Sequence, residues 1–268
     1  MSWRRQRRSA AFTLVELLVV IVVLAVLITL SLMAMGQVLT SAATTHAQNN
    51  LRQLAVANLA YAADHGTYCP AQSRDNNTRW HGSRSGSSEA WDPHGGYLAP
   101  YMRDGHYLQL CPLLEGHENT PTFEEGAGGY GYNAAYIGGR LNPANGRWDY
   151  STPNRPSGVP NPSQTIMFTT TAFARAGGVQ EYPYSEPPME AGGRFALQPS
   201  THFRASNDRA VVAWCDGRVS LEERNDSSGP DYYGGNSEEA EVGWFGPMEH
   251  NGYWNPRYQE LAARNASD

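Results

Sequence analysis

A single carboxylate, Glu16, lies near the start of a long apolar stretch, and its chemistry is the first question this chain raises. From Leu17 to Met35 no charged side chain occurs across 19 positions. A helix rises about 1.5 Å per residue, so this stretch nearly spans a bilayer core of about 30 Å. An unpaired carboxylate costs roughly 2.5 to 3.5 kcal/mol at the bilayer centre and less near its edge. We therefore expect Glu16 to form an ion pair with a cationic partner.

Two simpler interpretations of the apolar stretch are a secretory signal peptide and a plain single-pass anchor. A signal peptide would have an apolar core of about 7 to 15 residues followed by a small-residue cleavage site. Here the apolar run is longer, the small residues precede it, and Glu16 interrupts it. Positive flanks stay in the cytoplasm, so we expect everything after Met35 to lie outside it. The leader carries four such positive residues, Arg4, Arg5, Arg7 and Arg8.

The residues around Glu16 resemble a known processing signal. The run Ala11-Phe12-Thr13-Leu14-Val15-Glu16-Leu17-Leu18 is similar to the class III prepilin signal of type IV pilins and type II secretion pseudopilins. The resemblance implies that a prepilin peptidase cuts between Ala11 and Phe12 and methylates the new N-terminus. It also implies that Glu16 pairs with the Phe12 ammonium of a neighbouring pilin or pseudopilin subunit in the assembled filament. The chain would cross the inner membrane once, with its head in the periplasm or on an extracellular filament. Ala11 departs from the glycine that the family usually has.

Weaker matches extend the resemblance to about residue 221. They are typical of large pilin-like proteins whose head carries a Cys-Pro, a Tyr-Gly-Tyr-Asn and a terminal His followed by Asp-Gly. Thirteen residues separate His202 from Asp216, a longer spacing than is usual in that branch, so a shared role for the two is not implied. The matching segments are Cys111-Pro112, Tyr130-Gly131-Tyr132-Asn133, Asn161–Ile166, His202 and Asp216-Gly217-Arg218-Val219.

A second candidate for chemistry is a thiol nucleophile with a base, formed by Cys215, Asp216 and His202. Cys215 directly follows the apolar run Ala210–Trp214. A buried structural cysteine at the end of a strand is far commoner than a catalytic one. We therefore expect no catalytic site.

Metal and cofactor sites are weakly indicated. Asp216 with Gly217, or Asp64 with the acidic tail, could hold Ca²⁺ through oxygen ligands, but no carboxylates have the spacing of an EF-hand. An aspartate in a turn is the favoured interpretation. The eight histidines are dispersed, so zinc is not indicated, and no cofactor is expected.

The cysteine count is odd, with Cys69, Cys111 and Cys215. A compartment outside the cytoplasm permits disulfides, and three cysteines can form at most one internal pair. We favour Cys69 with Cys111, because both precede proline and both lie where the chain returns from the helix to the first predicted strand.

Composition limits the partners. The 268 residues carry a net charge of −6, and removal of the leader leaves 16 arginines against 26 carboxylates, a net charge of −10. Such a chain is a poor match for nucleic acid. About 200 residues follow the N-terminal helix, enough for one domain with its own core.

A second helical pattern follows the apolar run. Gly66 supplies a stop of the C-cap type, so one helix is predicted from about Phe12 to Asp64. We expect the N-terminal part of the chain to comprise a leader (1–11), the transmembrane half of this helix (12–35) and its amphipathic half (36–65). Apolar positions recur at three and four residue steps at Leu51, Leu54, Ala55, Asn58, Leu59 and Ala62.

The head is predicted over 66–224, followed by a Gly-rich, aromatic and acidic tail over 225–268. Residues 66–107 show no sustained period and read as a surface loop. Antiparallel pairing is the default for strands joined by short connections, so we expect an α+β, pilin-like fold in which the long helix packs on a small antiparallel sheet. The predicted strands are Tyr107–Cys111, Ile166–Thr171, Arg209–Trp214 and Arg218–Leu221, the last two joined by an Asp216-Gly217 turn, with Tyr130–Ile137 as a candidate that is partly loop.

Aromatic side chains in the tail allow two interpretations. They fold back on the head, or they contact a subunit or cargo. The same two interpretations apply to Trp80 and Trp91 in the long loop. The tail aromatics in question are Trp244, Phe245, Tyr253 and Trp254.

Two functions from different classes fit these patterns. One is a structural subunit, a pseudopilin or minor pilin, that polymerises through its N-terminal helix into a secretion or pilus filament. The other is a membrane-anchored module whose periplasmic head captures a glycan or a protein without polymerising. Glu16 favours the first, because a lone anchor has no need of a carboxylate in the membrane.

Overall fold

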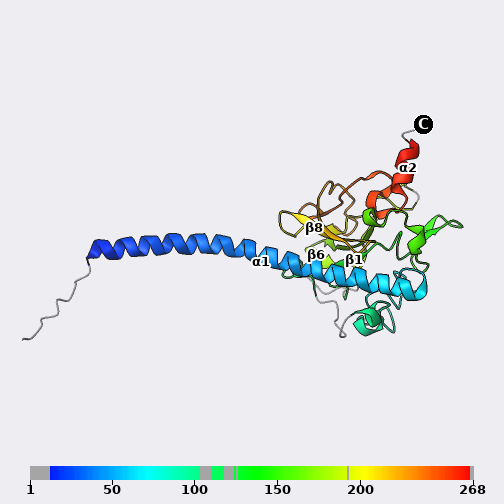
Figure 1. Ribbon diagram of the computed structural model, residues 1–268, viewed down its shortest axis with the longest axis horizontal. Helices are drawn as coiled ribbons and strands as arrows, with labels where there is room; N and C mark the ends of the chain where they lie inside the picture. The colour runs from blue at the N-terminus through cyan, green and yellow to red at the C-terminus, as the bar shows by residue number, and fades with distance from the viewer. Residues whose placement is uncertain (1–12, 103–109, 118–123, 125, 192, 266–268) are drawn as a thin grey trace, which may run out of the picture. The chain divides into compact units, whose positions relative to one another are not determined.

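The computed structural model describes residues 13–102, 110–117, 124, 126–191 and 193–265. The chain forms two compact units, Met1–Thr40 and Ser41–Asp268 (Figure 1). One helix, α1 (Leu14–His65), begins in the first unit and ends in the second. The predicted long helix is therefore confirmed, and it ends at His65, one residue beyond the expected position.

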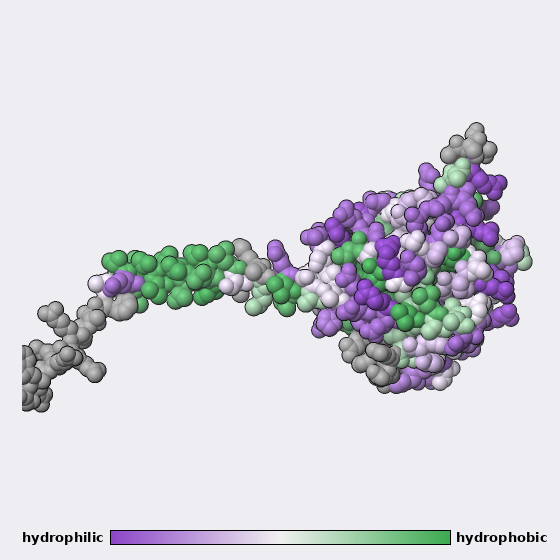
Figure 2. Space-filling view, viewed as in Figure 1, coloured by the Kyte–Doolittle hydropathy of each residue, from purple (hydrophilic) through white to green (hydrophobic). Residues whose placement is uncertain are grey.

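The described part of the first unit is Thr13 and the apolar half of α1. Its large side chains are exposed, as Leu14 at 83% and Leu27 at 54% illustrate, and they form the green surface along the helix in Figure 2. The Thr29 hydroxyl donates to the Ala25 carbonyl at 2.6 Å, and the Ser31 hydroxyl donates to the Leu27 carbonyl at 2.8 Å. Because these hydroxyls bond to their own helix, they need no water. By length and composition α1 could cross a membrane.

The second half of α1 is amphipathic, as its period predicts. Leu51, Leu54 and Asn58 are fully buried, whereas Val56 on the other side of the helix is 57% exposed. Burial of each leucine contributes about 1.5 to 3 kcal/mol relative to exposure. The helix ends where Gly66 adopts a φ of +73°, with its N–H donating to the Ala62 carbonyl at 2.9 Å. A left-handed residue at this position is the usual way to end a helix.

A four-stranded antiparallel sheet forms the centre of the head. Its strand order is β1-β4-β8-β9. Strands β4, β8 and β9 coincide closely with the predicted strands, and the Tyr130 candidate is a short strand followed by turns, as expected. The bounds are β1 (Tyr130–Tyr132), β4 (Ile166–Thr170), β8 (Arg209–Trp214) and β9 (Val219–Glu223).

The predicted Asp216-Gly217 turn joins β8 to β9. Gly217 has a φ of +87°, and the Trp214 N–H donates to the Arg218 carbonyl at 2.9 Å. The Asp216 carboxylate accepts the Arg218 N–H at 2.9 Å. A side chain that bonds the backbone two residues on is the ordinary role of aspartate in a turn.

The rest of the head contains short helices and strands, which are too short to show a periodic pattern in the sequence. Three two-stranded sheets pair β2 with β3, β5 with β6, and β7 with β10. The strands are β2 (Arg140–Asn142), β3 (Arg147–Asp149), β5 (Ala172–Arg175), β6 (Gly178–Glu181), β7 (Thr201–His202) and β10 (Val242–Gly243). The helices are η1 (Pro93–Gly95), η2 (Ala99–Tyr101), η4 (Pro156–Gly158), η5 (Pro162–Gln164), η6 (Glu249–Trp254) and α2 (Tyr258–Asn265).

One predicted strand and the predicted surface loop need correction. Residues 107–109 lie outside the described residues, and Leu110 and Cys111 belong to no strand. The segment after Gly66 is not a surface loop, because Trp80 is fully buried and its indole N–H donates to the Pro183 carbonyl at 2.9 Å. A segment can enter the core without a regular period when single large side chains supply the contacts.

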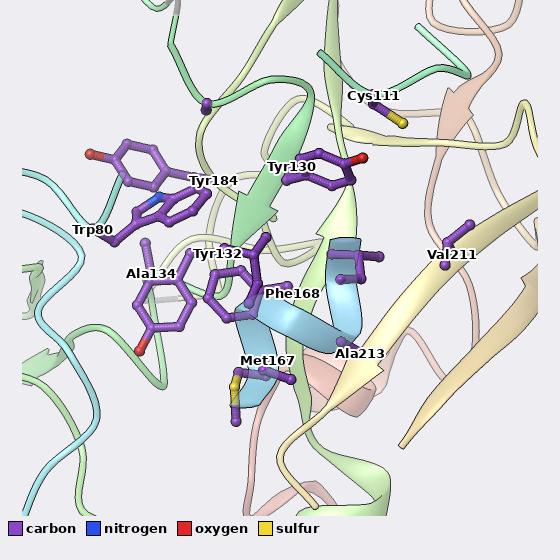
Figure 3. Close-up of a cluster of buried hydrophobic side chains, with 14 of the residues drawn as sticks. Trp80, Cys111, Tyr130, Tyr132, Ala134, Met167, Phe168, Tyr184, Val211 and Ala213 are labelled. Carbon is purple, nitrogen blue, oxygen red and sulfur yellow. The ribbon is translucent and has the colours of Figure 1, made fainter. Parts of the chain in front are cut away.

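The core holds Trp80 against the sheet. In Figure 3 its ring lies beside Tyr132 and Phe168. The ring centroids of Trp80 and Phe168 are 5.3 Å apart. Tyr132 and Phe168 stack at 4.7 Å. Packed aromatic pairs of this kind contribute about 0.5 to 1.5 kcal/mol beyond their burial.

The aromatic tail folds back on the head. Trp244, Phe245 and Trp254 are nearly fully buried in a second cluster with Ile166 and Phe203. The Trp254 indole N–H donates to the Ser185 hydroxyl at 3.0 Å, and that of Trp244 donates to the Glu186 carbonyl at 3.1 Å. The structure therefore favours the first of the two interpretations of the tail.

Two histidines are buried without hydrogen-bond partners in the described part of the chain, His81 and His202. Burial lowers the pKa of His81 to about 3, and the cations of Arg79 and Arg84 act in the same direction. Burial and the nearby Arg204 hold the pKa of His202 well below its usual value. Both rings are therefore neutral at pH 7.

Leu54→Asp should unfold the head, because it places a carboxylate in the dry contact between helix and sheet. We expect a loss of about 4 kcal/mol or more in the free energy of unfolding, measured by urea denaturation of the compact unit 41–268. Val56→Asp, two residues away on the exposed face, is the matched control and should change stability by less than about 0.5 kcal/mol. Equal effects of the two would contradict the assigned core face.

The head should also lose stability in mild acid. The stability that neutral His81 provides is complete above its unfolded pKa of about 6.5 and is lost as the pH falls towards about 3. Each such histidine contributes a slope of up to about 1.4 kcal/mol per pH unit in this window. His81→Leu should flatten the dependence measured by urea denaturation between about pH 6.5 and 4.5, whereas replacement of the exposed His46 by Leu should not. An unchanged slope in His81→Leu would show that the ring is not buried neutral.

Candidate functional site

The candidate site is the start of α1. The cleavage residues of the prediction, Ala11 and Phe12, lie outside the described residues. The described part begins at Thr13, directly before the first helical residue, Leu14.

Thr13 and Glu16 form a reciprocal cap at this end of the helix. The Thr13 N–H and hydroxyl both donate to Glu16 Oε2, at 2.8 and 2.7 Å. The Glu16 N–H donates to the Thr13 hydroxyl oxygen at 3.2 Å. This is the capping box, in which a Thr and a Glu three residues later satisfy each other's backbone donors. Our sequence prediction missed the role of Thr13, although the Thr-x-x-Glu spacing is its signal.

The cap fixes the position and orientation of the carboxylate. Glu16 is held in the first turn, where the positive end of the helix dipole favours an anion. Within the described residues Glu16 makes no ion pair. One copy of the chain thus presents an oriented carboxylate at the edge of the apolar run.

Polar contacts hold the amphipathic half of α1 to the head. Asn58 Nδ2 donates to the Tyr132 hydroxyl at 3.0 Å, and that hydroxyl donates to the Cys69 carbonyl at 3.0 Å. The Cys69 N–H returns to Asn58 Oδ1 at 2.9 Å, which closes a ring of three bonds. All three residues are buried, so each of these groups would be costly to leave unpaired.

The Tyr-Gly-Tyr-Asn segment is the sheet's side of this contact. The Tyr130 hydroxyl accepts from Asn50 Nδ2 at 2.8 Å. Asn50 lies about two helical turns before Asn58 in α1. Asn133 Nδ2 donates to the Ile166 and Trp254 carbonyls, both at 2.9 Å. A Cβ on Gly131 would lie 2.3 Å from the Thr171 methyl, so only glycine fits between the two tyrosines. The segment therefore joins the helix, the sheet and the tail.

The three cysteines are free and buried. The predicted Cys69–Cys111 disulfide is not formed in the structure, where Cys69 lies beside Tyr132 and Cys111 beside Tyr130. Burial raises the pKa of the Cys111 thiol to about 11 and raises those of Cys69 and Cys215. Protonated, enclosed thiols are poor nucleophiles.

The structure does not assemble the thiol and histidine into a reactive group. His202 lies in β7 and neither of its ring nitrogens has a hydrogen-bond partner in the described part of the chain. Asp216 serves its own turn, through the Arg218 N–H. Asp64 accepts from the Tyr101 hydroxyl at 3.0 Å. Among the described residues there is no group of three or more His, Cys, Asp or Glu placed to hold a metal ion.

Comparison with known proteins identifies one segment. Residues 6–32 match the family model described as the prokaryotic N-terminal methylation motif. No curated protein and no solved structure matches the chain. The match contains Ala11, Phe12 and the capped Glu16, but it does not reach the His202 and Asp216-Gly217 segments, so it leaves that branch of the resemblance without support. The chain thus carries an N-terminal methylation motif of the prepilin type on the helix that bears Glu16.

Proposed function

We propose that this chain is a structural subunit of a filament, a pseudopilin or minor pilin of a type II secretion or type IV pilus system. It is cut between Ala11 and Phe12 by a prepilin peptidase and methylated on Phe12. It resides in the inner membrane with its head outside the cytoplasm until it assembles through α1. The observation that carries the proposal is the methylation motif at 6–32, which overlaps a helix whose Glu16 is oriented and makes no ion pair with a described residue.

The cap with Thr13 uses an oxygen of Glu16 within one copy, whereas the Glu16 charge is used in an assembly. In lipid it is a cost, and the ammonium of a neighbour's Phe12 offsets that cost. Thr13 holds one oxygen of Glu16 at the helix end. Cleavage at the proposed position would leave Thr13 in the chain, so the cap survives processing.

The exposed side chains of the first helical half support the same function. Leucine and valine side chains from Leu14 to Leu30 are about half or more exposed in one copy. Lipid covers such a surface before assembly, and the helices of other copies cover it in a filament. The head has no reactive thiol, and we propose no enzymatic role for it.

A second function, a membrane-anchored module that binds without polymerising, has one observation in its favour. Phe195, Tyr232 and Tyr233 are 67%, 61% and 51% exposed. The Tyr232 hydroxyl donates to the carbonyl of Ala196, the residue after Phe195, at 2.8 Å. Exposed aromatics of this kind suit ligand capture. The module needs no assembly, so the experiments below separate the two functions.

Processing is the first test. The mature chain should begin with N-methyl-phenylalanine at Phe12, as measured by mass spectrometry of the protein extracted from membranes. The Ala11→Gly variant should be processed equally or faster, because glycine is the residue that the family usually has there. An intact N-terminus, or a cut beyond Leu30, would rule out the prepilin interpretation.

Assembly is the second test, and it separates the charge of Glu16 from its capping role. Glu16→Leu removes both, whereas Glu16→Gln keeps an acceptor for the cap and removes only the charge. Thr13→Ala weakens the cap by about 1 kcal/mol and keeps the charge. We expect both Glu16 variants to insert into the membrane and to lose filaments, measured as cross-linked oligomers and sheared surface fibres. Oligomers at the wild-type level in Glu16→Gln would contradict the ion pair.

A further inference from the structure

Charge is distributed unevenly along the sequence of the head. Residues 126–180 contain four arginines and one carboxylate, a net charge of +3, in a chain that is acidic overall. Residues 201–249 contain four arginines and ten carboxylates, a net charge of −6. In Figure 1 the bright green β2–β3 hairpin and the yellow segment of β8 lie on different sides of the head.

The positive part includes a small hairpin that forms a sheet by itself. Strands β2 and β3 pair only with each other, and Arg140, Arg147 and the residues 143–146 between them are exposed. Neither arginine takes part in an ion pair with a described residue. Asp149, opposite Arg140, accepts instead from Ser151 and Thr152. The two cations are thus available to a partner.

The hairpin also presents an apolar group. Leu141 is 43% exposed and lies opposite Trp148 in the pairing. An isolated two-stranded hairpin has little stability of its own in water. A hairpin that combines unpaired cations with an exposed leucine has side chains suited to contact with another protein surface.

The negative part is organised so that its carboxylates face outward. In the pair Arg209–Glu223 the arginine side chain is 34% exposed and the glutamate 77%. In Arg224–Glu238 the values are 28% and 65%, and Arg204–Glu241 follows the same pattern. Strand β9, which carries Glu222 and Glu223, is the terminal strand of the central sheet. Glu238 accepts from Arg224 and Ser227, the neighbours in sequence of Glu223 and Asp226, so these carboxylates lie close to the end of β9. We call the group Glu222, Glu223, Asp226 and Glu238 the acidic edge.

We propose that the β2–β3 hairpin of one copy docks on the acidic edge of a second copy, as a contact between heads in the filament. The inference rests on the proposed function, because it takes the filament as the setting. The two surfaces differ, so the contact is heterologous, and heterologous contacts that do not close generate helical filaments. In this contact the excess of carboxylates on the acidic edge compensates Arg140 and Arg147, which make no ion pair with a described residue of their own chain.

A second copy fits the hairpin better than an anionic polymer would. The acidic edge and the net charge of the mature chain repel a polyanion, whereas they attract the hairpin of an identical chain. The same charges also disfavour contact between two acidic edges, since like charges juxtaposed in an interface cost several kcal/mol. Charge thus selects the pairing and its direction.

The test uses the full-length chain in membranes, with cysteines at exposed positions on the two surfaces. Ala144→Cys at the hairpin tip and Ser228→Cys beside the acidic edge are joined by a short bis-maleimide, which the buried native thiols do not reach. Separately, Val38→Cys, 65% exposed on α1, reports contact between helices. We expect Ala144–Ser228 dimers in wild-type assemblies. Arg140→Glu with Arg147→Glu should reduce them about tenfold. Added Glu222→Arg should restore them in part, because Glu222 belongs to the acidic edge and makes no ion pair with a described residue.

The outcomes separate this inference from the proposed function. Helix cross-links without Ala144–Ser228 cross-links would overturn the head contact and leave the filament intact. Loss of both in the wild-type chain would overturn the filament and the contact together. Arg194→Glu with Arg257→Glu is the matched control, since these arginines are exposed outside the hairpin, and it should leave both cross-links unchanged. Head cross-links that resist both charge reversal and 1 M salt would show a contact of another kind.

Discussion

The structure depends on one helix that meets two surroundings. The first half of α1 is apolar on every side, and the second half is apolar on one side only, where Leu51 and Leu54 are buried. An all-round apolar helix is stable when lipid or other helices cover it, and an amphipathic one when it covers a core. The helix is continuous, so one element supplies both the apolar surface that lipid or other helices can cover and the stripe on which the sheet packs.

The link between helix and head is polar as well as apolar. Asn58, Tyr132 and Cys69 close a buried ring of hydrogen bonds between α1, the segment that follows it and the central sheet. Apolar packing alone would tolerate sliding of the helix along the sheet. Buried polar groups do not, because any shift leaves them without partners. The ring therefore fixes the register between the helix and β1.

The same logic explains Glu16. A carboxylate at the membrane edge is unfavourable unless its lone pairs are satisfied, and Thr13 satisfies part of them within one copy. The charge itself remains unpaired among the described residues. The cap therefore leaves the charge uncompensated, and in the proposed filament the ammonium of a neighbouring copy compensates it.

The sequence by itself determined the elements whose pattern is long or local. Three patterns could be recognised from neighbouring residues alone: the apolar run, the stripe from Leu51 to Ala62 and the Asp216-Gly217 turn. The N-terminal motif could be recognised in the same way. Only the tertiary structure decided where single side chains go. Trp80 enters the core from a segment without a period, Trp254 returns from the tail to Asn133, and the cysteines take tyrosine partners, because contacts between residues distant in sequence leave no local pattern. Strands of two to four residues are likewise defined by their pairing partners, since so short a run carries almost no propensity of its own.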